Sequence, residues 1–246
     1  MNVKEKDAGI QKPLNQRPQE PVTINNVPVL AFHSVNRNEF EAKIKYLKES
    51  GYQSMFVSEF FDLCKNNRKL NQKTVVITSD DGYISDYEVF YPVLKEYGMK
   101  GVVNIVTSKL TNSADYVSGI QLKDMTGSGI IEAGSHTHNL HNDKLLSSKG
   151  ETSAVYQNRL KDDFIKSKQI LKNVTGKETS VFALPYGRYN KEIAAALKDA
   201  GFNKILGSAR GLNDASFCTE GTVFKRVTRT DISAKSFKEM VDNNFQ

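Results

Sequence analysis

Two groups of side chains in this sequence have the composition of a metal-dependent hydrolytic site. An apolar segment ends in two adjacent carboxylates, Asp80 and Asp81, which a glycine follows. Three of the four histidines lie in one heptapeptide, SHTHNLH, at residues 135–141, directly after another apolar segment. Adjacent carboxylates and clustered imidazoles are costly to hold together unless a cation or a shared proton compensates. The two groups therefore predict one metal site that activates water for hydrolysis.

The aspartate pair has a simpler alternative explanation, because Asp-Asp-Gly on its own is typical of a surface turn. Successive residues of a strand point to opposite faces. Asp80 and Asp81 can therefore serve one site only if the strand ends before them, and Gly82 makes such a turn easy. One carboxylate would then bind a cation while the other stays free as a base. The histidine cluster at a second strand end favours this interpretation.

The histidine heptapeptide offers a choice of metal ligands. Two imidazoles with one carboxylate give the three-ligand, open-position arrangement of catalytic zinc, whereas nothing supports an all-oxygen site for calcium or magnesium. His136 and His141 fit this pattern across a short loop. His138 is an alternative, because His136 and His138 would share a face if the strand continued. We favour His141, because Thr137 and Asn139 are typical of a loop. Hydrogen-bonded histidines on a wet loop would explain one such residue but not three.

Two further segments are weaker candidates when taken alone. In the sequence LPYGRYN, Pro185 and Gly187 shape a turn whose free backbone N–H groups could face an oxyanion. An ordinary strand-to-helix loop explains the same sequence. His33 follows the apolar run VLAF, where a structural histidine is the simpler interpretation. In a parallel barrel, however, this position would open into the same mouth as the other groups.

The elements that position these residues alternate along the chain. Strands are predicted over residues 27–32, 74–78, 101–106, 130–133, 180–184, 203–206 and 222–227. Helices are predicted over 38–51, 58–66, 85–97, 121–128, 151–174, 191–200 and 234–243. This alternation indicates a parallel sheet with crossover helices, and about seven units favour a closed or nearly closed α/β barrel. The reactive side chains then gather at the carboxyl-terminal strand ends.

The composition is that of an ordinary globular protein of 246 residues, with 39% hydrophobic and 25% charged residues. The net charge of +6 is spread along the chain without an arginine-rich helix, so we expect no nucleic-acid partner. Residues 1–26 are polar and proline-containing, which predicts a flexible tether and neither a signal peptide nor a membrane span. Cys64 and Cys218 are either buried thiols or one disulfide.

Three of these segments carry a resemblance to a known family. The sequences SDDGY from Ser79, SHTHNLH from Ser135 and LPYG from Leu184 resemble the first three motifs of the NodB-type polysaccharide deacetylases, carbohydrate esterase family four. The stretch 30–35, which contains His33, resembles the branch that de-N-acetylates poly-N-acetylglucosamine in biofilm matrices. The resemblance covers residues 27–227, and the aspartate pair and histidine loop together are its specific part.

The resemblance implies a fold and a set of roles. The fold is a deformed, incomplete (β/α)7-type barrel over residues 27–246. Its divalent metal, usually Zn²⁺ with Co²⁺, Ni²⁺ or Fe²⁺ as alternatives, would be held by Asp81, His136 and His141. Asp80 would be the general base, and the backbone N–H of Tyr186 would stabilise the oxyanion.

The sequence departs from the family pattern at three positions. An arginine usual two residues before the motif proline, where it orients the base, is replaced by Ala183. No histidine follows His141, so the late histidine acid of many members is missing. Both absences, and the five-residue histidine spacing, fit the biofilm branch, in which the first strand supplies the acid. Elimination and resemblance thus both indicate His33. Ser79 replaces a bulky aromatic residue before the aspartates.

The function implied is metal-dependent de-N-acetylation of an N-acetylglucosamine polymer, with poly-β-1,6-N-acetylglucosamine as the expected substrate. The alternatives are a peptidoglycan or chitin-type deacetylase and a degenerate, non-catalytic polysaccharide-binding module. We expect a bacterial monomer outside the cell or at its surface, held there by peripheral contact or a lipid anchor, with the export signal absent from this chain.

Overall fold

Eight parallel strands form one sheet in the computed structural model, which describes residues 27–65, 73–111, 113–214, 221–227, 230 and 232–244. The order along the sheet is β1-β3-β4-β5-β6-β7-β8, and β2 pairs with the first half of β3. A parallel bridge between Leu30 and Val227 joins β1 to the chain just beyond β8. The prediction of a nearly closed parallel barrel is therefore confirmed. The strands are β1 (Val29–Phe32), β2 (Gln53–Met55), β3 (Thr74–Asp81), β4 (Gly101–Ile105), β5 (Ile131–Ser135), β6 (Val181–Ala183), β7 (Lys204–Leu206) and β8 (Val223–Phe224).

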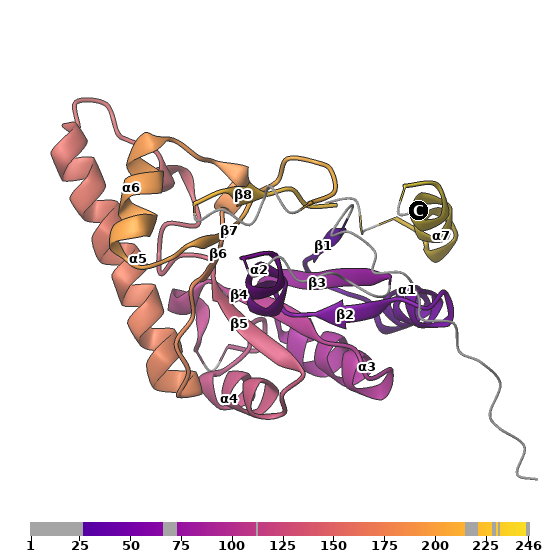
Figure 1. Cartoon of the computed structure of the whole chain (residues 1–246). Coiled ribbons are helices and arrows are strands. Elements are labelled where there is room, and N and C mark those ends of the chain that lie inside the picture. The colour runs from indigo at the N-terminus through magenta and orange to yellow at the C-terminus, as the bar shows by residue number, and fades with distance from the viewer. Residues whose placement is uncertain are drawn as a thin grey trace, which may run out of the picture.

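Helices surround this sheet, with α5 and α6 on one side and α1 and α7 on the opposite side (Figure 1). Their bounds agree with the predicted ranges except over 85–97, where a π-helical turn, η1 (Asp86–Phe90), precedes α3. Strand β2 was not predicted, because its three residues are exposed or half-buried and show no apolar run. The α-helices are α1 (Arg37–Glu49), α2 (Val57–Lys65), α3 (Tyr91–Glu96), α4 (Gly119–Gly127), α5 (Ser153–Thr175), α6 (Lys191–Asp199) and α7 (Ala234–Asn244).

Local signals in the sequence explain where these helices begin and end. The side chain of Ser118 accepts from the backbone of Gln121, whose own side chain accepts from the backbone of Ser118, so α4 begins in a capping box. Thr152 and Asn190 cap α5 and α6 in the simpler way. Helix α5 ends at Gly176, which adopts the left-handed conformation.

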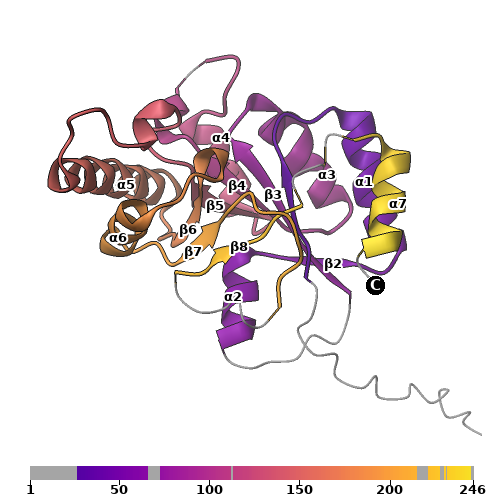
Figure 2. The same cartoon turned by 90° about the horizontal axis from the view of Figure 1, so that it is seen from above.

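The core has two layers because successive strand residues alternate between the barrel lumen and the surrounding helices. Helix α2 stands apart from the helices on either side (Figure 2) and packs Phe60 and Phe61 into the lumen cluster with Val76 and Val102. On β3, Val76 therefore faces the lumen, and the neighbouring Val75 and Ile77 pack against the helices in the larger cluster. The side chains that fill the lumen are thus apolar at the end where α2 packs. Polar side chains can therefore be placed at the opposite end.

Two predictions from the sequence fall outside the described residues. One is the flexible tether over residues 1–26. The other is the state of the cysteines, because the side chain of Cys64 and the whole of Cys218 are not described. Within the described ranges, no helix combines the length and the apolar character that crossing a bilayer requires.

Candidate metal and hydrolytic site

The two aspartates lie at the carboxyl end of β3, but the strand does not end before them as expected. Asp80 pairs with Asn104 and Asp81 with Ile105, so the ladder to β4 runs through both residues. The change of direction occurs within the strand instead, because Asp81 has a φ of 78° and Gly82 a φ of 76°. Strict alternation would send Asp81 to the helix side, and its left-handed backbone interrupts that alternation. Both carboxylates can therefore serve one site.

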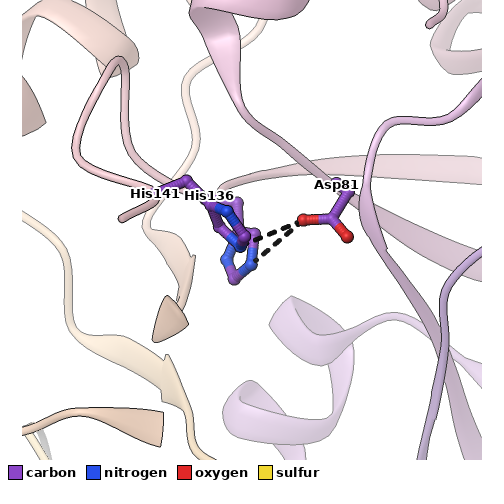
Figure 3. A group of neighbouring side chains, drawn as sticks. All are labelled: Asp81, His136 and His141. Atoms are coloured by element: carbon purple, nitrogen blue, oxygen red, sulfur yellow. Dashed lines mark ion pairs between the residues drawn. The ribbon is translucent and has the colours of Figure 1, made fainter. Parts of the chain in front are cut away.

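Asp81, His136 and His141 converge on one point (Figure 3). Asp81 Oδ1 lies 3.1 Å from His141 Nε2 and 3.6 Å from His136 Nε2. One ligand atom from each residue falls within 4.8 Å of the other two. Asp81 Oδ1 is buried and accepts no hydrogen bond among the described residues. A buried carboxylate oxygen is costly without a partner, so this donor set fits a divalent cation.

The ring of His136 is held in place by a hydrogen bond at Nδ1, the ring nitrogen that does not face Asp81. Its Nδ1 lies 2.8 Å from the carbonyl oxygen of Ala183 on β6, so Nδ1–H donates and Nε2 is left with a lone pair toward Asp81. Burial lowers the pKa of His136, which favours the neutral form that a metal needs. Ala183 stands where the family that the sequence resembles usually has an arginine. Its backbone carbonyl thus orients the candidate ligand His136.

The third histidine of the heptapeptide is used differently. His138 Nδ1 lies 3.1 Å from Thr107 Oγ1, and the structure does not bring the alternative ligand His138 into the cluster. The two carboxylate oxygens of Asp163, on α5, accept the backbone N–H groups of His138 and Asn139, each at 2.8 Å. Asp163 therefore fixes the loop between the two candidate ligands, and nothing in the heptapeptide itself points to it.

Asp80 lies on the lumen side and is fully paired. Arg226 Nη1 lies 2.8 Å from Asp80 Oδ2 and 2.9 Å from Oδ1, and Asn104 Nδ2 donates to Oδ1 at 2.8 Å. Burial alone would raise the pKa of Asp80, but the positive charge of Arg226, together with the hydrogen bond from Asn104, lowers it to about 2. Asp80 is thus ionised at neutral pH.

A glycine on the neighbouring strand makes this arrangement fit. A Cβ at Gly134 would lie 2.1 Å from Asn104 Oδ1, well inside van der Waals contact. Gly134 therefore leaves room for the amide that donates to Asp80.

His33 is exposed and lines a cavity of about 790 Å³ together with Asp81 and Tyr83. A second hollow of about 280 Å³ is also lined by Asp81 and Tyr83, with His141 and Tyr116. The rings of Tyr83 and Tyr116 stack with centroids 5.2 Å apart. Asp81 and Tyr83 thus border two hollows, and the candidate ligand His141 lines the smaller one.

Tyr186 follows β6 beside the candidate ligands. Its φ of 55° is left-handed, and its ring is 63% exposed and lies 5.0 Å from the ring of His141. Among the described residues, no acceptor takes a hydrogen bond from its backbone N–H. Asp81, Thr137 and Tyr186 are the non-glycine residues with positive φ in the described chain, and each lies at or just beyond the end of a strand at the site. Such strained backbone is typical of functional sites.

Arg226 is the main site residue that the sequence reasoning missed. It is 3% exposed and lies 146 positions from Asp80 in the sequence. One signal was available, because Arg226 comes two residues after Phe224, which faces the lumen. An arginine on the lumen side of a last strand needs a buried carboxylate.

Comparisons with known proteins place the chain in a family. The family described as polysaccharide deacetylase matches residues 67–205. The chain is 32% identical to YxkH of Bacillus subtilis (strain 168) over 185 residues, which is 72% of this chain and 62% of that protein. It is 30% identical over 173 residues to the poly-beta-1,6-N-acetyl-D-glucosamine N-deacetylase of Staphylococcus aureus (strain MSSA476), covering 69% of this chain and 59% of the relative. The chain thus spans about three fifths of both proteins.

The fold is similar to solved structures. The structure of a de-N-acetylase from Aggregatibacter actinomycetemcomitans superimposes with a TM-score of 0.76 at 24% identity, covering 87% of this chain and all of that one.

Proposed function

Because this chain belongs to the polysaccharide deacetylase family, we propose that it hydrolyses the N-acetyl groups of an N-acetylglucosamine polymer with the help of a divalent metal. One observation carries the proposal: the two adjacent carboxylates have different partners. Asp80 is held ionised by a buried arginine, and Asp81 turns an unpartnered oxygen toward two imidazoles. A base beside a set of side chains that could hold a metal ion is what amide hydrolysis by activated water requires.

The metal would be held by Asp81, His136 and His141. Two imidazole nitrogens and one carboxylate oxygen favour Zn²⁺ over Ca²⁺ or Mg²⁺, whereas Co²⁺, Ni²⁺ and Fe²⁺ accept the same donors. When bound, such an ion acts as a Lewis acid toward the acetamide and lowers the pKa of water.

Asp80 is the proposed general base. Arg226 and Asn104 fix its carboxylate and keep it ionised, so it can accept a proton from the attacking water. A carboxylate with a pKa of about 2 is a weak base, which explains why it needs a water made more acidic by a neighbouring cation.

Tyr186 and His33 complete the reaction. The backbone N–H of Tyr186, which borders His141, would donate to the developing oxyanion. His33 lines the larger cavity with Asp81, from where it would protonate the departing amine. Protonation is needed because an amide anion is a very poor leaving group.

The substrate that we infer is poly-β-1,6-N-acetylglucosamine. The support is the Staphylococcus aureus relative named for this polymer and the first-strand position of His33. Such a polymer lies in the matrix or the cell envelope, so we infer that the protein acts outside the cell or at its surface. Asp81 and Tyr83 line both hollows, which favours a chain over a single sugar as the substrate.

The test is metal analysis of the purified chain combined with acetate release from three polymers. They are β-1,6-linked N-acetylglucosamine oligomers, chitin-type β-1,4 oligomers and peptidoglycan. We expect one zinc per chain, loss of activity with a chelator, its return on adding Zn²⁺, and the highest rate on the β-1,6 oligomers. Activity on peptidoglycan alone would overturn the substrate. A metal-loaded chain that binds glycan and releases no acetate would overturn the catalytic function.

A further inference from the structure

The loop that carries His33 is hydrogen-bonded to a buried serine–aspartate pair on the helix side of β3. The ladder between β1 and β3 ends at the pair Phe32–Ser79. Beyond it, Ser79 Oγ lies 3.1 Å from the carbonyl oxygen of His33 and 2.6 Å from Asp86 Oδ1. Ser79 and Asp86 are fully buried. The serine side chain thus continues the ladder by one residue, to the candidate acid itself.

The number of protons in this chain of atoms fixes the direction of its bonds. The hydroxyl of Ser79 has one proton and the carbonyl of His33 has none, so Ser79 must donate to His33 to form that bond. Ser79 then has no proton left for Asp86. The 3.1 Å and 2.6 Å contacts of Ser79 Oγ are hydrogen bonds at the same time only if Asp86 carries a proton and donates it to Ser79 Oγ.

The surroundings of Asp86 agree with a protonated carboxyl group. Burial raises the pKa of Asp86 well above its usual value, and the nearby charges of Asp80 and Asp81 act in the same direction, against the hydrogen bond with Ser79. Asp86 Oδ2 is buried and has no partner in the described chain. A neutral carbonyl oxygen tolerates this far better than a carboxylate oxygen does.

A second bond holds the other end of the same loop. The backbone N–H of Val35 donates to Ser85 Oγ at 3.3 Å, and Ser85 immediately precedes Asp86 at the start of η1. The ring of His33 makes no hydrogen bond with the described residues, so its place in the cavity depends on its backbone. That backbone is tied to the segment 79–86 at two points.

We propose that Asp86 and Ser79 are positioning residues for the acid of the reaction: Asp86 donates as a neutral carboxylic acid to Ser79, whose hydroxyl donates to the carbonyl of His33. The inference rests on the proposed function, which makes His33 the acid. An aromatic side chain, usual in the family at the place of Ser79, could not transmit this bond.

The test compares three variants of the full chain. Asp86→Asn keeps a neutral donor of the same shape, whereas Asp86→Leu and Ser79→Ala each break the chain of bonds. We expect Asp86→Asn to keep the kcat of the native chain within a factor of about 2, and the other two to lower kcat roughly 10- to 100-fold, because a misplaced catalytic group costs up to that much. KM and bound zinc should not change.

The double variant Ser79→Ala, Asp86→Leu should lose no more than either single variant, because both act through one bond to His33. Thr126→Val is the matched control, since it removes a buried hydroxyl that bonds only within α4. It should lower stability and leave kcat unchanged. If Asp86→Asn is as slow as Asp86→Leu, the carboxylate charge is what matters and the proposal is wrong.

Two measurements on the resting protein separate this inference from the proposed function. An infrared band of a protonated carboxyl group should be present in the native chain at neutral pH and absent in Asp86→Asn. The nuclear magnetic resonance signals of the His33 backbone should shift in Ser79→Ala and stay in place in Asp86→Asn. If the chain released no acetate but the infrared band and the resonance shifts were as expected, the proposed function would fail, while the inferred bonds from Asp86 through Ser79 to His33 would stand. Absence of the infrared band would overturn the inferred bonds, whatever the activity.

Discussion

The two adjacent aspartates of the site lie in opposite electrostatic surroundings. We call Asp80 with Asn104 and Arg226 the base side, and Asp81 with His136 and His141 the ligand side. On the base side the fold supplies the counter-charge, because Arg226 contacts both oxygens of Asp80. On the ligand side it supplies two imidazoles and leaves Asp81 Oδ1 without a hydrogen bond among the described residues. The fold thus pairs the Asp80 carboxylate fully and leaves one oxygen of Asp81 without a hydrogen bond, as the proposed metal ligand.

This difference predicts that the two sides respond differently to mutation. The base side holds its geometry with or without a cation, because its bonds are all internal. In our proposal, the unpartnered oxygen of Asp81 on the ligand side is satisfied when the cation binds. Loss of a base-side group should therefore reduce turnover and spare the metal, and loss of a ligand-side group should reduce both.

The largest effect is expected from Asp81→Asn, which removes the anionic ligand. Zinc affinity should fall by orders of magnitude and acetate release should become undetectable, because the neutral amide is a poor zinc ligand. Competition titration against a chromophoric chelator measures the affinity. Asp143→Asn is the matched control, because Asp143 is 96% exposed and forms an ion pair with Arg188 on the surface. If Asp81→Asn bound zinc with native affinity, Asp81 would not be a metal ligand and the proposed difference between the two sides would be wrong.

Next in size is Asp80→Asn on the base side. We expect kcat to fall roughly 10²- to 10⁴-fold, the usual contribution of a general base, while the zinc content stays at the native level. Steady-state kinetics and metal analysis of the same preparation provide both numbers. A parallel loss of zinc would mean that Asp80 is also a ligand, and full activity would remove it from the base role.

A smaller loss is expected from Arg226→Met, which keeps the length of the side chain and removes its charge. The pKa of Asp80 should rise, because burial then acts without its main opposing charge. Leaving Asp80 buried without its counter-charge should cost about 3–5 kcal/mol of stability. Its displacement should lower kcat up to about 100-fold. Thermal unfolding and the pH profile of kcat check both effects, and an unmoved acid limb would contradict the role of Arg226.

The same comparison shows what the sequence could reveal. The ligand side could be predicted because its histidines lie in one heptapeptide and its aspartate ends a strand, so local spacing carries the information. Periodicity likewise predicted the barrel, because strands and helices leave different repeats. The roles of these residues stay predictions.

The base side could not be assembled in this way, because Arg226 reaches Asp80 from the opposite end of the chain. Ala183 indicated that an arginine was missing from its usual place, but only the closed barrel shows that the segment just beyond the last strand provides one. The left-handed Asp81 was also beyond sequence reasoning, since positive φ is uncommon for any non-glycine residue and nothing in the local pattern singles out Asp81 over Asp80. Spatial partners and strained backbone are set by tertiary structure and leave little trace in local patterns.

The smallest predicted effect is the pH dependence of stability that arises from Asp80 on the base side. The pKa of Asp80 is about 2 in the folded chain, below the roughly 3.9 of an unfolded aspartate. Its ionised form therefore stabilises the fold above about pH 4, and this contribution, about 2 kcal/mol, is lost as the pH falls from about 4 to 2, because the unfolded chain binds the proton first. The double variant Asp80→Asn, Arg226→Met removes both charges and should lack this loss. Urea unfolding of the metal-free native protein and double variant gives the free energy of unfolding at pH 5 and at pH 2.5. If this free energy falls equally in both proteins between the two pH values, Arg226 does not hold Asp80 in its ionised form.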